Sequence, residues 1–324
     1  MGIARLARRW HVWLPASLAL AISAGHLGML HPALDSFSHL RPQLIGLAFA
    51  TSVALLIGRR WLEALALAAL ALASSVPTLR WYEPETVELD GEALVILQQN
   101  LLYRNDDAAA FLERVREVQP DVIALQEVKR AGRAMASALA AEYPYRHTCR
   151  GASAVGDVMI VARLPIVGGR SCTPGLAVAR FRVGRTPFTV ASLHLHWPWP
   201  APQNRHIESL RAVLGAIEAP AIMVGDYNAV PWSHAMRRLE RMMDGRAVPG
   251  VGNTRIDLDW PAALRPFWDL PIDHVVTTEG LVVRSVEAIP LRGSDHDSVV
   301  TRATVLAAPV EQEARLSRRA GPRG

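Results

Sequence analysis

The pattern of hydrophobic and polar positions divides the chain near residue 80. Before it lie three apolar stretches, roughly Val12 to Leu30, Leu44 to Ile57 and Leu62 to Val76, and after it charged and polar residues are interspersed throughout. A helix that spans a bilayer needs about 20 apolar residues, which these stretches approach. We therefore expect residues 1–80 to be a membrane region with about three transmembrane helices.

Basic residues around these stretches predict their orientation. Arg5, Arg8 and Arg9 precede the first stretch, and Arg59 with Arg60 follow the second. The positive-inside rule places both groups in the cytoplasm, so a third crossing puts the large domain outside, in an extracytoplasmic position. The alternative interpretation is a cleaved signal peptide followed by a buried helical hairpin.

The rest of the chain predicts an α/β domain over residues 93–307, after a linker at 81–92 and before a disordered tail at 308–324. Short apolar runs typical of buried strands alternate with helical periods, which favours packed sheets covered by helices. The expected strands are Ala93 to Leu97, Asp121 to Leu125, Val158 to Val161, Pro187 to Leu195, Ala221 to Val224 and three runs near 272–276, 281–286 and 298–305, with a helix over Gln203 to Ile217.

Composition changes this picture in two respects. The net charge of +5 comes from residues 1–80 and the tail, which leaves about −2 for residues 81–307, so the basicity is no argument for a nucleic-acid substrate. The only two cysteines, Cys149 and Cys172, both lie in the domain. They form either a disulfide, which an extracytoplasmic position would permit, or two buried thiols.

Polar side chains follow several predicted strands where each strand ends. Asn100 and Glu127 follow the first two, and Asp226 with Asn228 follow the run at 221–224. Hydrolysis of a phosphodiester needs a cation, a base that activates water, and donors for the charge that develops. Oxygen ligands from Asn100 and Glu127 suit Mg²⁺ or Mn²⁺, and Asp226, Asn228 and Asp295 could complete such a site.

Histidines supply the remaining chemistry. His296 can act as the base if Asp273 holds its other ring nitrogen, and His194 could donate to a phosphate oxygen. The pair His194 and His196 also suggests a zinc site as an alternative, although no cysteine is close. A serine-hydrolase triad through Asp295 and His296 lacks its Gly-x-Ser-x-Gly elbow.

Taken in order, these segments resemble the endonuclease/exonuclease/phosphatase superfamily over about residues 93–305. The resemblance implies a four-layer α/β sandwich of two packed mixed sheets flanked by helices, with a magnesium-dependent site on one rim. Ala162 and Tyr227 depart from residues frequent in such proteins, without removing a catalytic group. By this similarity, Asn100 and Glu127 bind metal, and Asp295 lies near it. His194 contacts phosphate, and Asp226 and Asn228 position the nucleophile or bind the phosphate and a metal. Asp273 orients the general base, His296.

The substrate stays open between two classes. Trp197-Pro198-Trp199-Pro200 follows the His194 segment, where it would suit stacked bases, a lipid interface or ordinary packing. We expect a membrane-anchored metal-dependent phosphodiesterase, with nucleic acid slightly ahead of phospholipid as substrate. The alternative from another class is a catalytically inert membrane-tethered binding module.

Overall fold

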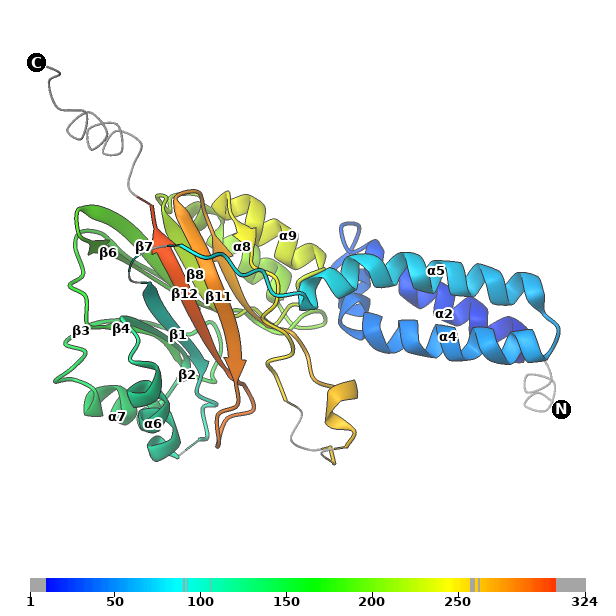
Figure 1. Ribbon diagram of the computed structural model, residues 1–324, viewed down its shortest axis with the longest axis horizontal. Helices are drawn as coiled ribbons and strands as arrows, with labels where there is room; N and C mark the ends of the chain where they lie inside the picture. The colour runs from blue at the N-terminus through cyan, green and yellow to red at the C-terminus, as the bar shows by residue number, and fades with distance from the viewer. Residues whose placement is uncertain are drawn as a thin grey trace, which may run out of the picture.

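The large domain is a four-layer sandwich (Figure 1). A computed structural model describes residues 10–306 except 90, 92, 106, 257–259 and 262, so the predicted tail at 308–324 lies outside the described residues. Two six-stranded mixed sheets pack face to face, and helices cover both outer faces. The predicted fold class is therefore confirmed.

The first sheet has the order β11-β12-β1-β2-β4-β3. Its centre joins the beginning and the end of the domain, because β1 pairs antiparallel with β12 and parallel with β2. Its strands are β1 (Leu94–Asn100), β2 (Val122–Val128), β3 (Tyr145–Cys149), β4 (Asp157–Ala162), β11 (Leu281–Ile289) and β12 (Ser298–Val305).

The second sheet has the order β5-β6-β7-β8-β10-β9. Strands β7 and β8 run parallel, and β10 pairs antiparallel with β8 so that its first residue lies opposite the last residue of β8. Its strands are β5 (Arg170–Thr173), β6 (Leu176–Val183), β7 (Thr186–His194), β8 (Ala221–Asp226), β9 (Arg246–Ala247) and β10 (Asp273–Thr277).

Three apolar layers hold the sandwich together. The layer between the sheets includes Ile96 and Val224, both without exposed surface. Helices α6 (Ala108–Val118) and α7 (Arg130–Ala138) bury Phe111 and Met135 on the first sheet. Helices α8 (Gln203–Leu214) and α9 (His234–Met243) bury Leu210 and Leu239 on the second. The short helix η3 (Arg265–Phe267) lies outside these layers, in the loop before β10.

A bundle of long apolar helices extends from one end of the sandwich (Figure 1). Helix α2 (Trp10–His26) runs toward the domain, α3 (Pro32–Ser36) and η1 (Phe37–Leu40) turn the chain, α4 (Arg41–Ile57) runs away, and α5 (Trp61–Leu79) with η2 (Arg80–Tyr82) returns. At 1.5 Å per residue, the 19 residues of α5 measure about 28 Å, close to the ~30 Å hydrocarbon core of a bilayer.

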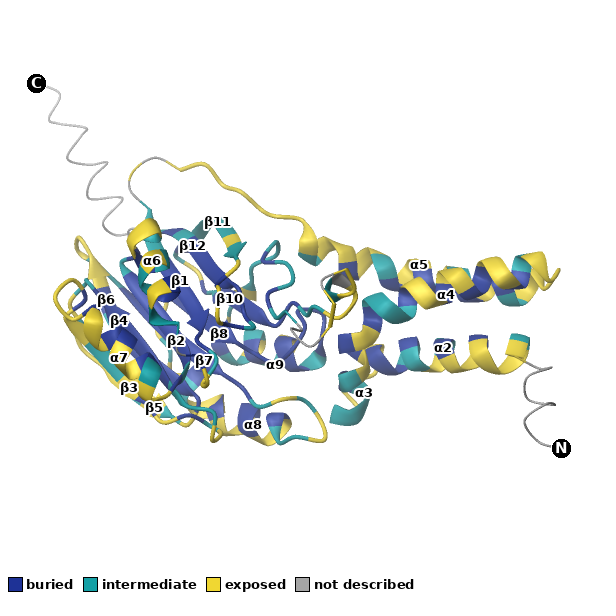
Figure 2. Cartoon of the chain, turned by 90° about the horizontal axis from the view of Figure 1, so that it is seen from below, coloured by how far each residue is buried: buried dark blue, intermediate teal, exposed yellow. Residues whose placement is uncertain are grey.

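The outer faces of this bundle are apolar rather than polar. Leu20 is 73% exposed and Leu62 is 82% exposed, and Figure 2 shows exposed residues along both α4 and α5. Two helical segments, Pro32–Ile57 and Trp61–Tyr82, have the length and hydropathy of a membrane span, while the described part of α2 is slightly shorter at 17 residues. The exposed leucines do not match the alternative of a buried hairpin, and the region is compatible with a membrane anchor.

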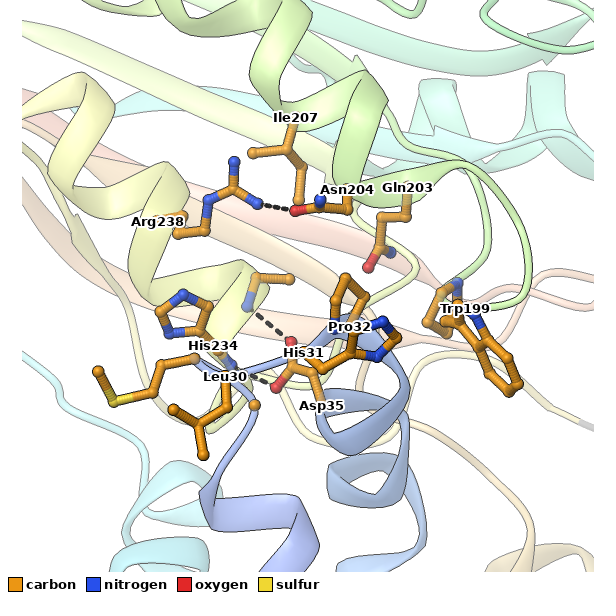
Figure 3. A pocket seen from close by; sticks show the side chains of 14 residues that line it. Leu30, His31, Pro32, Asp35, Trp199, Gln203, Asn204, Ile207, His234 and Arg238 are labelled. Carbon is orange, nitrogen blue, oxygen red and sulfur yellow. Dashed lines mark hydrogen bonds between the residues drawn. The ribbon is translucent and has the colours of Figure 1, made fainter.

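The turn between α2 and α4 docks on the domain. Both carboxylate oxygens of Asp35 accept backbone hydrogen bonds at the start of α9, from His234 at 2.6 Å and Ala235 at 2.8 Å (Figure 3). Trp232 donates from Nε1 to the Ser38 carbonyl at 2.8 Å. A cavity of about 340 Å³ lies at this junction. The helical region and the domain are therefore in direct contact, in addition to the connection through residues 83–93.

The two cysteines form a disulfide. Cys149 ends β3 and Cys172 lies in β5, and their Cα atoms are 5.3 Å apart. Because β3 and β5 are edge strands of different sheets, the bond joins the two sheets at one side of the sandwich. Of the two alternatives for these residues, the structure shows the disulfide.

Candidate active site

Strand ends from both sheets deliver the candidate residues to one rim. Asn100 ends β1, His194 ends β7 and Asp226 ends β8. In the second sheet, Asp226 lies opposite both His194 and Asp273, because β8 pairs with β7 on one side and with β10 on the other. Parallel neighbours end at the same edge of a sheet, which explains why the sequence brings these side chains together.

A carboxylate–imidazole cluster forms the centre of the rim. One ligand atom each from Glu127, His194 and Asp226 lie within 4.8 Å of one another. Asn100 joins them, since its Nδ2 donates to Glu127 Oε1 at 3.2 Å and to Asp226 Oδ2 at 3.0 Å. Its Oδ1 accepts from the Leu102 backbone N–H at 2.9 Å and keeps a second lone pair.

The backbone of Glu127 is unusual for a strand. Its φ of 57° is left-handed, and the pairing of β2 with β4 shifts register between Leu125 and Val128. Gly156 makes this possible, because a Cβ there would lie 2.6 Å from the Glu127 carbonyl carbon. The Tyr103 backbone N–H then holds Glu127 Oε2 at 2.9 Å. Such a conformation persists only where the surroundings impose it, and it commonly marks functional sites.

His296 and Asp273 form a buried pair. His296 Nδ1 donates to Asp273 Oδ2 at 2.7 Å, while His296 Nε2 lies 3.7 Å from Asp226 Oδ2. Both side chains are at most 4% exposed. The imidazole is therefore fixed with one nitrogen on a carboxylate and the other toward the cluster, which is the arrangement that a general base requires.

Asn228 carries a feature that fits a cation or a phosphate group. Its φ is 45°, its backbone N–H donates to Asp226 Oδ1 at 2.9 Å, and its Nδ2 donates to the Leu195 carbonyl at 2.8 Å. Its Oδ1 is buried without a hydrogen-bond partner among the described residues. An unpaired buried oxygen costs free energy, so a ligand that binds it would be stabilising.

The charge states follow from burial and proximity. Burial raises the pKa of Asp226 to about 7 and lowers that of His194 to about 4. Burial opposes the charge of His296, but Asp273 and Asp226 outweigh it and raise the His296 pKa to about 10. Burial likewise opposes the charge of Asp273, yet His296 and hydrogen bonds hold its pKa below the usual range. A cation in the cluster would lower the His296 pKa toward the neutral form that accepts a proton.

Two predicted residues lie differently from this group. Asp295 is half-buried and its carbonyl accepts from the Ile256 N–H, but within the described part of the chain its carboxylate has no recorded bond to the cluster. Its role near a metal stays a prediction. The ring of His196 packs on His206 at 5.2 Å, and neither belongs to the ligand groups formed by the described residues, so the geometry gives the zinc alternative no support.

The two departures noted from the sequence are structural. Tyr227 is fully buried, and its hydroxyl donates to the Met223 carbonyl at 3.1 Å. Ala162 has no exposed surface and belongs to the apolar layer between the sheets. Neither side chain reaches the cluster through a recorded contact among the described residues.

The sequence did not predict a network of polar side chains that hydrogen-bonds Asp273 on the side away from His296. Gln98 Nε2 donates to Asp273 Oδ1 and to Gln126 Oε1, both at 2.8 Å, and Gln126 donates to Ser192 Oγ at 3.0 Å. Thr254 Oγ1 accepts from the Asp273 backbone N–H at 3.1 Å, and the Thr254 side chain also hydrogen-bonds the Asp273 carboxylate. The signal for Gln98 was its position two residues before Asn100, because alternate residues of a strand share a face. Nothing around Thr254 distinguished it from an ordinary loop residue.

The fold and the site define a metal-dependent phosphoric ester hydrolase. A model of the Endonuclease/Exonuclease/phosphatase family matches residues 97–296, more than half of the chain. The chain therefore belongs to the endonuclease/exonuclease/phosphatase family. Comparison with curated proteins finds no match.

Solved structures share the fold at low sequence identity. The endonuclease/exonuclease/phosphatase from Beutenbergia cavernae DSM 12333 is 21% identical with a TM-score of 0.57, over 68% of this chain and 73% of that one. A family protein from Leptotrichia buccalis C-1013-b is 14% identical with a TM-score of 0.52, over 65% of this chain and 100% of that one. TDP2 of D. rerio, solved with a single-strand DNA product, is 17% identical with a TM-score of 0.53, over 66% of this chain and 100% of that one.

Proposed function

We propose that the chain is a membrane-anchored phosphodiesterase in which His296 activates the attacking water. The observation that carries this proposal is the direction of His296, held by Asp273 at 2.7 Å with Nε2 facing the cluster of Glu127, His194 and Asp226. A binding module gains nothing from this arrangement. A base beside a candidate cation-binding centre is instead what metal-assisted hydrolysis needs.

Each residue has a separate task in the proposed reaction. Glu127 and Asp226 would hold Mg²⁺ or Mn²⁺, and the unpaired Asn228 Oδ1 offers a further oxygen. Asn100 would join them through Oδ1, which requires that its amide turn from the orientation in which Nδ2 faces the two carboxylates. Such an ion supplies charge neutralisation for the phosphate when bound. His194, neutral because burial lowers its pKa to about 4, donates one hydrogen bond to a phosphate oxygen. Asp273 keeps His296 oriented while it takes the proton from water.

Hydrolysis of bis(p-nitrophenyl) phosphate by the full chain in detergent tests this proposal. We expect turnover that needs Mg²⁺ or Mn²⁺ and is lost with a chelator. His296→Ala should lower kcat by at least about 100-fold, the typical range for loss of a general base. Glu127→Gln should instead raise the metal concentration needed for half-maximal rate. Arg182→Gln, at an exposed position of β6, is the matched control. No metal-dependent turnover would favour the inert binding module.

The proposed anchor is the helical bundle, with the domain outside the cytoplasm. The start of α2, which carries Trp10 and Trp13, and the start of α5, where Trp61 follows Arg59 and Arg60, are at the end of the bundle away from the domain (Figure 1), as expected of an interface on the cytoplasmic side. The disulfide supports an oxidising location for the domain. Digestion of the domain by protease added to intact spheroplasts is the expected result, whereas protection until the membrane is permeabilised would reverse the orientation.

Nucleic acid is the substrate class that the sequence placed slightly ahead of phospholipid, and a basic groove suits it. The groove has a volume of about 940 Å³, and Arg104, Lys129, Arg130 and Arg150 are among its lining residues. A structural neighbour, TDP2 of D. rerio, was solved with a DNA product. Mg²⁺-dependent nicking of plasmid DNA that disappears in His296→Ala would establish a nuclease. Any extended polyanion could use the groove, however, so the groove alone does not choose the substrate.

A further inference from the structure

Exposed tryptophan and phenylalanine side chains of the domain gather on two loops, whereas the exposed Tyr103 and Tyr145 lie elsewhere. Among the described residues after 90, the exposed tryptophans and phenylalanines are Trp197 and Trp199 in the loop after β7 and Trp260, Phe267 and Trp268 in the loop before β10. Phe267 is 63% exposed. Large exposed aromatic groups concentrated in this way mark a surface that meets something other than water.

Both loops contact the helical bundle where it leaves the domain. The Trp199 carbonyl accepts from Ser36 Oγ at 3.1 Å, and the Phe267 carbonyl accepts from Gln43 Nε2 in the first turn of α4. Figure 3 shows Trp199 beside the turn that contains His31 and Pro32. If α4 crosses a bilayer, its first turn lies at the membrane–water interface. Tryptophan is enriched at that level because its ring is apolar and its N–H is polar.

The same loops border the catalytic centre. Trp197 follows His194 by three residues, and the Arg255 guanidinium lies 5.2 Å from its ring centroid. Arg255 also forms a backbone bridge with His296. From the bundle itself, His39 Nε2 lies 3.4 Å from the Asn228 carbonyl. A side chain of the bundle is therefore in contact with the backbone of a residue of the reacting centre.

The basic groove opens on another part of the centre. Tyr103 lines it and also holds Glu127 through its backbone N–H. Arg133 pairs with Asp157, and Lys129 lies over the Tyr103 ring at 4.6 Å. Helix α7, which contributes Arg130 and Arg133, lies at the end of the domain remote from the bundle (Figure 1). An anionic group in the groove would thus point away from the membrane.

We propose that the substrate is an anionic phospholipid of the same membrane that holds the helices. In this proposal the scissile phosphate of the lipid lies between His296 and Glu127. The acyl chains of the lipid face the aromatic loops, and the headgroup of the lipid enters the basic groove. The inference rests on the proposed hydrolysis. The water oxygen forms a bond to phosphorus, its proton passes to His296, and one ester P–O bond breaks with the leaving alkoxide taking up a proton.

The test uses the full chain reconstituted into vesicles. Phosphatidylcholine vesicles are prepared alone or with phosphatidylglycerol, phosphatidylserine or cardiolipin, and the lipid products of cleavage at either ester bond, diacylglycerol and phosphatidic acid, are quantified with Mg²⁺ or Mn²⁺. The matching deacylated glycerophosphodiesters, the soluble ester bis(p-nitrophenyl) phosphate and plasmid DNA are assayed in parallel. We expect cardiolipin, whose headgroup carries a second phosphate for the basic groove, to be hydrolysed more than tenfold faster than its deacylated counterpart, and faster than phosphatidylglycerol, phosphatidylserine or phosphatidylcholine.

Two sets of variants locate the effect. Trp260→Ser with Trp268→Ser should lower the ratio of the lipid rate to the soluble-ester rate at least tenfold, as should Arg104→Gln with Arg130→Gln. Val183→Ser and Arg182→Gln, both exposed on β6, should leave that ratio unchanged. If the serine variants fail to fold, the comparison of vesicle with deacylated substrate in the unaltered chain still decides.

The outcomes separate the two proposals. Turnover of the soluble ester without hydrolysis of any vesicle lipid overturns the lipid inference and leaves the phosphodiesterase intact. Plasmid cleavage faster than lipid hydrolysis also overturns it, in favour of a nuclease. Absence of turnover on every substrate contradicts the proposed function itself.

Discussion

At the residue scale, the proposed base His296 depends on Gln98, a side chain without a place in the proposed substrate contacts. Gln98 donates to the Asp273 oxygen that His296 leaves free. Because both Asp273 oxygens are then occupied, the carboxylate keeps one orientation, and so does the imidazole bound to it. Gln98 is a positioning residue in this view, and a substitution there should alter the base without touching the metal ligands.

We expect Gln98→Leu to lower kcat about 10- to 100-fold, the usual effect of losing such an outer hydrogen bond. KM should change little, because no substrate contact is lost. If Gln98 has a purely structural role, the pH dependence of kcat stays unchanged. If Gln98 acts as a donor to Asp273, its loss raises the pKa of Asp273 and so moves the acidic limb of the pH–kcat profile. An unaltered pH–rate profile would contradict the assignment.

Another residue-scale prediction concerns His274, which is 3% exposed. Its Nε2 lies 2.7 Å from the Ala229 carbonyl oxygen. Burial lowers its pKa from 6.5 to about 4. The unfolded chain therefore takes up a proton first, so the stabilisation is complete above pH 6.5 and is lost as the pH falls toward 4. By pH 5 the expected loss is about 2 kcal/mol, from 1.36 kcal/mol per pKa unit.

Thermal unfolding at pH 7.5 and pH 5 checks this value. The drop in Tm on acidification should be smaller in His274→Gln than in the unaltered chain, whatever the substitution does to Tm at pH 7.5. Equal drops in the two proteins would contradict this, because they would mean that His274 has the same pKa in the folded and unfolded states.

At the element scale, helix α9 depends on a residue almost 200 positions earlier. Asp35 accepts from two N–H groups in the first turn of α9, and Ser233 Oγ accepts from a third, that of Met236. A carboxylate at a helix N-terminus both satisfies these donors and interacts favourably with the helix dipole. Gly28 makes room, since a Cβ there would lie 2.3 Å from Asp35 Oδ1.

Asp35→Ala should therefore destabilise the protein by about 1–2 kcal/mol, the usual cost of removing a helix cap. Chemical denaturation of the full chain in detergent measures this. Asp35→Asn, which keeps one acceptor, is the graded control and should lose less. Equal stability of the alanine variant and the unaltered chain would mean that water replaces the cap without cost.

The disulfide acts between elements as well, because it joins an edge strand of each sheet. It closes a segment with a sequence separation of 23. Chain-entropy estimates give about 3 kcal/mol for a loop of this size. We expect Cys149→Ser with Cys172→Ser to lower the free energy of unfolding by about that amount. A reductant should lower the Tm of the unaltered chain but not that of the double variant; a reductant effect on both would point to another cause.

At the scale of the whole molecule, the sequence predicted the four-layer architecture and the strands that carry the site. Those strands are continuous apolar runs that end in polar residues, a pattern that survives without tertiary context. The β6 strand and helix α9 were not predicted. Leu176–Val183 has an apolar run at 176–179 as long as that of the predicted strand at 221–224, but Arg180 and Arg182 interrupt its second half, and His234–Met243 carries four arginines or histidines.

The candidate site was predictable only in part. His194, Asp226, Asp273 and His296 follow from residue type and position at strand ends, and they do lie together. The left-handed backbone of Glu127 and the supporting contacts of Gln98 and Thr254 could not be foreseen, because they depend on which strand lies beside which. The docking of Asp35 on α9 has the same character, since no local pattern links residues so far apart.

The pairing of β1 with β12 has a consequence for a chain that is still being synthesised. The first strand of the domain to leave the ribosome finds one of its two neighbours only when residues 298–305 have been made. His296 arrives at the same late moment. Domains generally fold as units during synthesis, so the helices can enter the membrane well before any hydrolytic centre exists. On the proposed membrane anchor and lipid substrate, a nascent chain would therefore be harmless to the bilayer that receives its helices.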